Sequence, residues 1–311
     1  MRGLVLETHN RMYRVGVDGH ILLCQPKGDI RRNSNLDYRL PVIGDQVELV
    51  KRKQKGRGIQ GLIIKIHGRK NQFARVTNSR LGRTQIMASN LDRVFIVSAL
   101  TRPGIQWGMI DRYLVYCELH QIQPILIMNK IDLDPQWELD ELVIYYRNLG
   151  YQLYGVSAKF QKGLDDFQKI SRKGISLLTG ASGVGKSSLI NAVCPQVSLA
   201  VQEVSEKSGL GKHTTSNSIL IPTVEGGYIA DSPGIREFIP PPEHLDDIRF
   251  GFREFLSHQS NCQFSNCLHI NEPKCGVRAA VGKDIHQTRY LSYLALVNEI
   301  REIENARPAG L

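Results

Sequence analysis

A stretch with the sequence GASGVGKS, residues 180–187, has the spacing of a phosphate-binding loop. The apolar run ISLL before it favours a strand, and KSSLINAV after it favours a helix, so backbone N–H groups and a helix start would face one anion. Lys186 would then reach the β- and γ-phosphates of a nucleotide, and the Ser187 hydroxyl would bind Mg²⁺. A flexible turn without a ligand is the alternative, but it would not require the flanking strand and helix. The residues predicted to hold the phosphates are Gly180, Ala181, Ser182, Gly183, Val184, Gly185, Lys186, Ser187 and Ser188.

The motif NKID, residues 129–132, could identify the base. The Asp132 carboxylate can accept hydrogen bonds from N1–H and the exocyclic amine of guanine, a donor pair that adenine lacks. Asn129 would bond N7 and tie neighbouring loops together, and the aliphatic stem of Lys130 would cover the base. The motif SAK, namely Ser157, Ala158 and Lys159, follows the next apolar run, where the Ala158 N–H would bond guanine O6. Together these motifs predict a guanine nucleotide.

A further motif, DSPG, begins at Asp231. Asp231 would hold a water bound to Mg²⁺, and the Gly234 N–H would contact the γ-phosphate. Many GTPases place a glutamine directly after this motif to orient the attacking water, but here Ile235 occupies that position. The motif therefore predicts slow intrinsic hydrolysis, or another catalytic group.

That group could lie in GLGKHTTS, residues 209–216, whose glycines suggest a mobile loop. His213 could orient or polarise the attacking water, although it could equally be an ordinary polar loop residue. Thr215, or with less support Thr214, could give Mg²⁺ a second hydroxyl ligand.

Three cysteines and a histidine near the C-terminus have the spacing C-x4-C-x-H-x5-C. Three thiolates and one imidazole suit tetrahedral Zn²⁺ and leave no ligand position open, so the pattern predicts one structural zinc ion. His258 is a possible substitute ligand, and unrelated buried cysteines are the alternative interpretation. The remaining cysteines, Cys24, Cys117 and Cys194, lie on apolar stretches and are expected to be packing residues. The predicted zinc ligands are Cys262, Cys267, His269 and Cys275.

The nucleotide motifs require an α/β domain with a mainly parallel sheet, which we place at residues 71–240. Apolar runs such as RVFIVSAL and PILIMNK read as buried parallel strands, and WGMIDRYLVYCELHQI has a helical period. In most guanine-nucleotide switches the phosphate loop precedes the base-reading motif, but here it follows. Circular permutation explains this order without changing the packed sheet, because domain termini often lie close together. In the permuted chain, the segment after DSPG leads directly into the C-terminal domain. We therefore expect this junction to transmit the change between the GTP-bound and GDP-bound states to that domain.

The first 70 residues read as about five short strands, which favours an OB-type barrel that binds RNA. Residues 1–75 hold 16 Lys and Arg against 6 Asp and Glu, and thus carry the whole net charge of +10. A basic surface confined to one segment indicates a polyanion partner, although a solvated surface is the alternative.

Residues 241–311 form the predicted zinc-binding domain, with a helical stretch at LDDIRFGFREFL and a C-terminal helix.

No apolar run approaches the length of a membrane span, and the start of the chain does not have the pattern of a signal peptide. We therefore expect a cytoplasmic protein that does not bind membranes, and we expect a monomer.

On these motifs the chain resembles the RsgA/YjeQ family of ribosome small-subunit-dependent GTPases over essentially its full length. The resemblance implies a permuted GTPase that binds the small ribosomal subunit and its rRNA, acts in late subunit maturation, and is stimulated by that subunit. It also implies GTP or GDP, Mg²⁺ and one Zn²⁺ as ligands, and His213 as the catalytic histidine of a G-x-H-T-T segment. Ser216 departs from the third threonine of many members. Two alternatives stay open: an RNA-binding assembly protein with GTP as a structural ligand, and a P-loop kinase.

Overall fold

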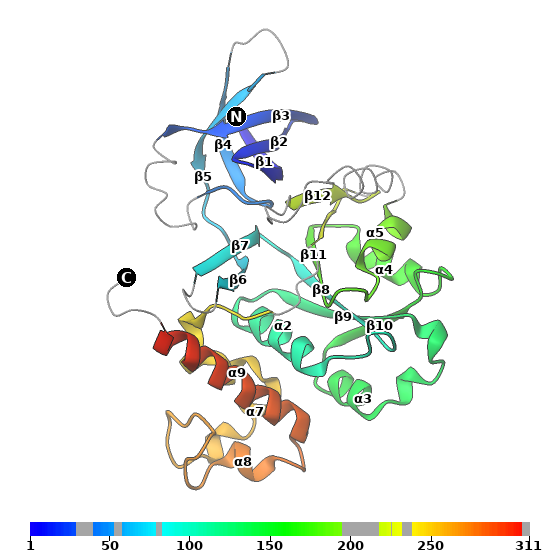
Figure 1. The fold of residues 1–311 in the computed structure, drawn as a ribbon, viewed down its shortest axis with the longest axis vertical. Coiled ribbons are helices and arrows are strands. Elements are labelled where there is room, and N and C mark those ends of the chain that lie inside the picture. The colour runs from blue at the N-terminus through cyan, green and yellow to red at the C-terminus, as the bar shows by residue number, and fades with distance from the viewer. Residues whose placement is uncertain are drawn as a thin grey trace.

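The computed structural model describes residues 1–28, 40–52, 58–78, 83–194, 218–224, 226–231 and 238–306. Its chain forms a strand-rich N-terminal part, a central sheet flanked by helices, and a helical C-terminal part (Figure 1). Within these described ranges, no helix is both long and apolar enough to cross a membrane.

The N-terminal part is a closed five-stranded barrel, as the sequence predicted. Its strands pair in the order β1-β2-β3-β5-β4, and β4 pairs again with β1 to close the ring. Alternate side chains point inward and form a small apolar core that includes Val5, Val15 and Val47. The strands are β1 (Arg2–His9), β2 (Met12–Val17), β3 (His20–Pro26), β4 (Gln46–Lys51) and β5 (Gly61–Ile66).

A β-hairpin that the sequence did not reveal links the barrel to the central sheet. It consists of β6 (Gln72–Asn78) and β7 (Arg83–Ser89), which form a separate antiparallel sheet instead of the alternating strands and helices expected from residue 71. Its Phe73 is fully buried and packs on Tyr116 and Phe238. The hairpin is thus held by side chains that lie far from it in the sequence.

The central sheet has the strand order β10-β9-β8-β11-β13-β12. Every pairing is parallel except that of β12 with β13, which confirms the predicted, mainly parallel α/β domain. The cluster on one face contains residues of α2 and α3, and the cluster on the other contains residues of α4 and α5. The strands are β8 (Arg93–Ala99), β9 (Gln123–Asn129), β10 (Gln152–Val156), β11 (Ile175–Thr179), β12 (Ser218–Pro222) and β13 (Tyr228–Asp231). The helices are α2 (Trp107–Leu119), α3 (Glu141–Asn148), α4 (Leu164–Ser171) and α5 (Lys186–Val193).

The barrel and the central sheet are joined by one short ladder. Strand β1 pairs antiparallel with β12 through Glu7 with Ile219 and Thr8 with Ser218, which produces an 11-stranded sheet.

The helical stretch predicted at the start of the C-terminal part is present, mostly as 3₁₀ helix. Residues Pro242–Gly251 form the 3₁₀ helix η4, and the four-residue α-helix α7 (Arg253–Leu256) follows it. The short elements η5 (Gln259–Asn261) and α8 (Gly276–Ala280) come next. The predicted C-terminal helix is present as α9 (Gln287–Ala306), and its Tyr293, Val297 and Ile300 are buried in the core of this part.

A buried ion cluster fixes α9 and α7 to α2. The Arg289 side chain is fully buried and donates to Glu254 at 2.6 and 3.1 Å and to Asp111 at 2.6 Å. The Tyr146 hydroxyl also donates to Asp111. Although burial alone would lower it, the two carboxylates raise the pKa of Arg289 well above its usual value. Such a cluster tolerates little movement, because separating its members would leave charge buried without a partner.

Candidate functional site

Four sequence motifs meet at one edge of the central sheet. Asn129 ends β9, Ser157 follows β10, Gly180 follows β11 and Asp231 ends β13. These four strands run parallel in one sheet, so their carboxyl ends lie at the same edge, where ligands bind in open α/β sheets. The permuted order along the chain therefore does not prevent the motifs from meeting in space.

The loop between β11 and α5 has a backbone that only glycine accommodates at two positions. Gly180 and Gly185 have φ values of +141° and +98°. A Cβ on Gly180 would lie 2.1 Å from the Val97 carbonyl oxygen, and one on Gly185 would lie 2.2 Å from the Asn129 side chain. The close approach of Gly185 to Asn129 brings the phosphate-loop motif against the base-reading motif.

Lys186 and Asp231 face each other beneath this loop. Lys186 is 7% exposed, and its Nζ donates to the carbonyl oxygens of Gly180 and Ala181, both at 2.9 Å. Burial lowers the pKa of Lys186, and Asp231 opposes that effect. Burial likewise raises the pKa of Asp231 to about 6, against the influence of Lys186. The Asp231 Oδ1 atom is buried and has no hydrogen-bond partner among the described residues, so the site offers both a cation and an unpaired carboxylate oxygen.

Asn129 connects three of the motifs. Its side chain is 2% exposed, and its Nδ2 donates to the Val184 carbonyl oxygen in the phosphate loop at 2.8 Å. Its Oδ1 accepts from the backbone N–H groups of Lys130 at 2.9 Å and Ala158 at 3.3 Å. The residue therefore ties neighbouring loops together, as the sequence suggested.

Lys130 and Asp132 are held by groups on neighbouring loops. Lys130 Nζ donates to the carbonyl oxygens of Arg102 at 2.6 Å and Gly183 at 2.9 Å, so its stem crosses the site toward the phosphate loop. The Ser157 hydroxyl donates to Asp132 Oδ1 at 2.5 Å, which orients the carboxylate.

A cavity of about 700 Å³ lies between these groups. It is lined by Asn129, Lys130, Asp132, Leu133, Ser157, Ala158, Lys159, Gln161, Gly185, Ser188, Asn191 and Ala192. Leu133, Gln161, Asn191 and Ala192 were missed by the sequence reading. Helical spacing could have indicated Asn191 and Ala192, which lie three and four residues after Ser188, whereas Leu133 and Gln161 lie in turns without a recognisable signal.

Part of the predicted site cannot be placed. His213, Thr214, Thr215 and Ser216, together with Gly234 and Ile235, lie outside the described residues. So does the segment after Asp231 that was expected to pass nucleotide state to the C-terminal domain. Ser187 is exposed in the first turn of α5.

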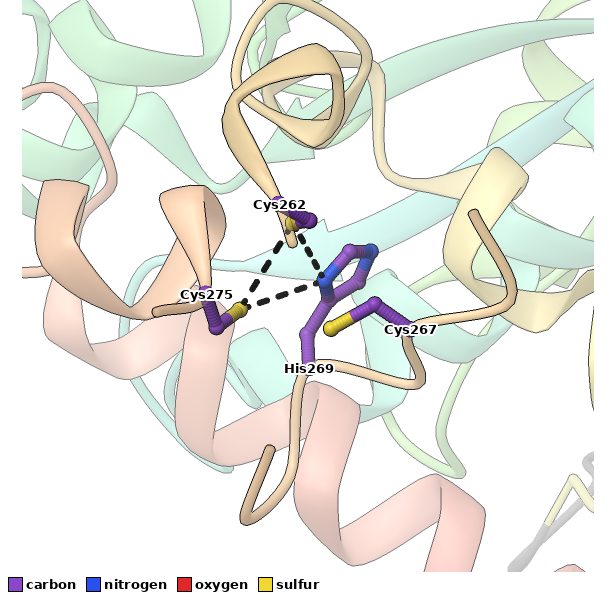
Figure 2. A group of neighbouring side chains, drawn as sticks. All are labelled: Cys262, Cys267, His269 and Cys275. Atoms are coloured by element: carbon purple, nitrogen blue, oxygen red, sulfur yellow. Dashed lines mark hydrogen bonds between the residues drawn. The ribbon is translucent and has the colours of Figure 1, made fainter. Parts of the chain in front are cut away.

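The predicted metal ligands form a compact cluster on the C-terminal part. Figure 2 shows Cys262, His269 and Cys275 joined by dashed lines, with the Cys267 sulfur beside them. The three contacts measure 3.3 to 3.9 Å. All four ligand atoms lie within 4.8 Å of one another. Ligand atoms of a tetrahedral zinc ion, at the usual bond lengths, lie about 3.5–3.8 Å apart, so this donor set fits zinc. His258 is not part of the cluster and instead lies 3.7 Å from Asp284.

Backbone and side-chain hydrogen bonds hold the loop that carries these ligands. The Glu272 carboxylate accepts from the N–H groups of Leu268, Ile270 and Asn271 at 2.8 to 3.1 Å. The N–H groups of Gly276 and Arg278 donate to two of the ligand sulfurs. Burial, followed by the neighbouring thiols, raises the pKa of Cys267 to about 12, so a bound cation would be needed to keep the cluster as thiolates.

Comparison with known proteins gives consistent matches. The RsgA GTPase family model matches residues 66–239. The chain is 36% identical to the small ribosomal subunit biogenesis GTPase RsgA of Caldanaerobacter subterraneus, over 99% of this chain and 98% of that one. It is 40% identical to the protein of the same name from Actinobacillus succinogenes, over 86% and 77% of the two chains. The structure of YjeQ from Thermotoga maritima superposes with a TM-score of 0.75 at 30% identity, covering 96% and 98% of the two chains. YloQ, described as a circularly permuted GTPase, gives 0.70 at 27% identity, covering 99% and 96%.

Proposed function

The chain belongs to the RsgA GTPase family and is a GTP hydrolase, and from this premise we propose that it binds the small ribosomal subunit and assists its late maturation. For the nucleotide site, the observation that carries the proposal is the joining of the NKID, SAK and phosphate-loop motifs around one cavity by the hydrogen bonds of Asn129. The relatives named as small ribosomal subunit biogenesis GTPases align with 86 to 99% of the chain, which supports the ribosomal partner.

In the nucleotide site, we assign recognition of the base to Asp132, oriented by Ser157, and to the Ala158 N–H. Lys186 turns from the carbonyl oxygens of its own loop to the β- and γ-phosphates, because these offer a full negative charge in place of neutral acceptors. Ser187 and Thr215 would ligate Mg²⁺, and Asp231, whose buried Oδ1 needs a partner, would hold one of its waters. When bound, Mg²⁺ would neutralise phosphate charge during attack by water.

We assign one structural Zn²⁺ to Cys262, Cys267, His269 and Cys275. The ion would stabilise a ligand loop that the hydroxyl groups of Tyr290 and Tyr293 attach to α9 through the carbonyl oxygens of His269 and Leu268. The four ligand residues lie against the apolar core of the C-terminal part, where without a cation three thiols and an imidazole would be packed together, so the shape of the loop would depend on the metal.

The barrel is our candidate for the RNA contact. Residues 1–75 carry the whole net charge of +10, and a positive surface of this kind attracts the phosphates of rRNA. We place the domain boundaries near residues 70 and 240, consistent with β6 beginning at Gln72 and η4 at Pro242. We propose that the protein acts as a cytoplasmic monomer, together with its ribosomal partner.

The test is a GTP hydrolysis assay of the full chain with and without purified small or large subunits. Small subunits should raise turnover, and large subunits should not. The stimulation should fall as salt increases from about 50 to 200 mM, because the contact depends on phosphate neutralisation. Equal rates with small subunits, large subunits and no subunits would refute the proposed partner.

Replacing His213 with alanine should lower stimulated turnover while leaving GTP affinity nearly unchanged. Loss of a general base or a water-orienting group costs about 100-fold or more. Stopped-flow binding of a fluorescent GTP analogue would separate affinity from turnover. A variant that hydrolyses GTP at the wild-type rate would show that His213 is an ordinary loop residue.

A further inference from the structure

We propose that Trp137 is a positioning residue for guanine recognition, and that its indole fixes the Asp132 carboxylate by supporting both base-reading loops at once. The inference rests on the proposed role of Asp132 in reading the base. Trp137 lies outside the NKID and SAK motifs and does not line the nucleotide cavity itself.

Trp137 anchors the segment that carries Asp132. After Lys130, the chain forms the 3₁₀ turn η2 (Ile131–Leu133), which is closed by bonds from Leu133 N to Lys130 O and from Asp134 N to Ile131 O. A bond from Trp137 N to Asp134 O leads directly into the next turn, η3 (Trp137–Leu139). Between residues 133 and 140 only Trp137 is buried, at 7% exposed. Its indole is therefore the buried side chain that anchors this segment in the apolar core of the domain.

The indole packs directly beneath the turn. It belongs to the apolar cluster of Met128 and Val143, against which Ile131 of the turn also packs. On the outer side, Trp137 and Asp132 line the same surface cavity of about 430 Å³. The Arg147 guanidinium lies 5.2 Å from the ring centroid, which adds a cation–π contact from α3. Movement of the ring would therefore shift the turn that bears the carboxylate.

The same indole also contacts the strand that leads to Ser157. A Cβ on Gly155 in β10 would lie only 2.2 Å from Trp137 Cζ2, so the glycine provides the space that the ring fills. Gly155 does not have a positive φ, so its backbone would accept alanine. Two residues further on, Ser157 donates to Asp132. The ring thus sets the separation between the hydrogen-bond donor and the carboxylate that it orients.

A carboxylate held in one direction discriminates between bases that differ by one donor. Inosine lacks the exocyclic amine of guanine, so a fixed Asp132 should favour GDP over IDP by about 10- to 100-fold, the value of one hydrogen bond to a charged group. A displaced indole should free the turn and reduce that preference. General loosening of the domain would instead lower the affinities for GDP and IDP by the same factor.

The experiment measures the dissociation constants of GDP and IDP by calorimetry for the wild type, Trp137→Phe, Trp137→Leu and Gly155→Ala. In Trp137→Leu and Gly155→Ala, the dissociation constant of IDP divided by that of GDP should fall at least about fivefold. In Trp137→Phe this ratio should stay close to the wild-type value. Gly155→Ala displaces the ring without removing it, so it tests the idea even if Trp137→Leu does not fold. The matched control is Gly227→Ala, whose Cβ would lie 2.7 Å from two carbonyl oxygens at another place in the domain. The control should lose stability and keep the ratio.

An unchanged ratio in Gly155→Ala, with both affinities lowered equally, would show that Trp137 is only a packing residue. The same conclusion would follow if the ratio of the two dissociation constants fell by the same factor in Gly227→Ala as in Gly155→Ala. A wild-type protein that binds IDP as tightly as GDP would instead overturn the assignment of Asp132 in the proposed function, and this inference with it.

Discussion

Replacing Lys186 with alanine should lower GTP hydrolysis on the order of 100- to 1,000-fold, the usual cost of removing a group that stabilises charge in the transition state. The Lys186 ammonium group is buried beneath the phosphate loop, 2.9 Å from two loop carbonyl oxygens and beside Asp231. The two lysines that line the nucleotide cavity, Lys130 and Lys159, lie on the base-reading loops, whereas Lys186 is held by the phosphate loop itself. Phosphate release measured at saturating GTP would give the change directly.

Two further variants make that result specific. Lys186→Met keeps most of the side-chain volume, so it should be as inactive as the alanine variant but better packed. Lys169→Ala removes an exposed lysine paired with Asp166 on α4 and should hydrolyse GTP at the wild-type rate. If the two Lys186 variants retained activity within about threefold, a phosphate-binding role for this lysine would be wrong.

Removing zinc should unfold the C-terminal ligand loop. The purified chain should contain about one zinc ion, and Cys275→Ser should lose it, because the variant lacks one of the four clustered ligand atoms. Binding of a structural zinc ion is worth about 10–16 kcal/mol in small zinc-binding peptides, so the loss should exceed that of any single packing residue. Metal analysis, combined with thermal unfolding before and after treatment with a chelator, would measure both effects.

The control for this prediction is Cys194→Ala. Cys194 is a buried cysteine at the end of α5, outside the cluster, so this variant should keep its zinc. A Cys275→Ser protein with a full equivalent of tightly bound zinc would contradict the assignment of the four ligands.

The sequence predicted the parts of the site that depend on local chemistry. Gly180 and Gly185 were recognisable from the spacing of the phosphate-loop motif, and the structure gives both a positive φ and a close approach that leaves no room for a Cβ. Asn129 and Asp132 end or follow an apolar strand, so the parallel sheet placed them at the predicted edge. The candidate metal ligands were recognisable because four donors lie within 14 residues of one another, and the structure brings them into one cluster.

The sequence did not predict contacts between distant segments. Arg289 pairs with Asp111, 178 residues away, and no motif around either residue indicates that the two would meet. The ladder between β1 and β12 covers only two residue pairs, and β12 alone reads as an ordinary strand of the central domain. Trp137 reads as one apolar residue in a polar loop until Gly155 is found against its ring. Such contacts depend on the tertiary fold, which local periodicity does not encode.

The most direct test of a single guanine pocket built from reordered segments is the base preference of Asp132→Asn. An asparagine side chain can donate to the 2-oxo group of xanthine, whereas aspartate accepts from the 2-amino group of guanine. Competition against a fluorescent guanine nucleotide should show that the wild type prefers GDP over XDP and ADP, and that the variant prefers XDP. If ADP competed as well as GDP in the wild type, or if the variant kept its guanine preference, Asp132 would not read the base and the shared pocket would be wrong.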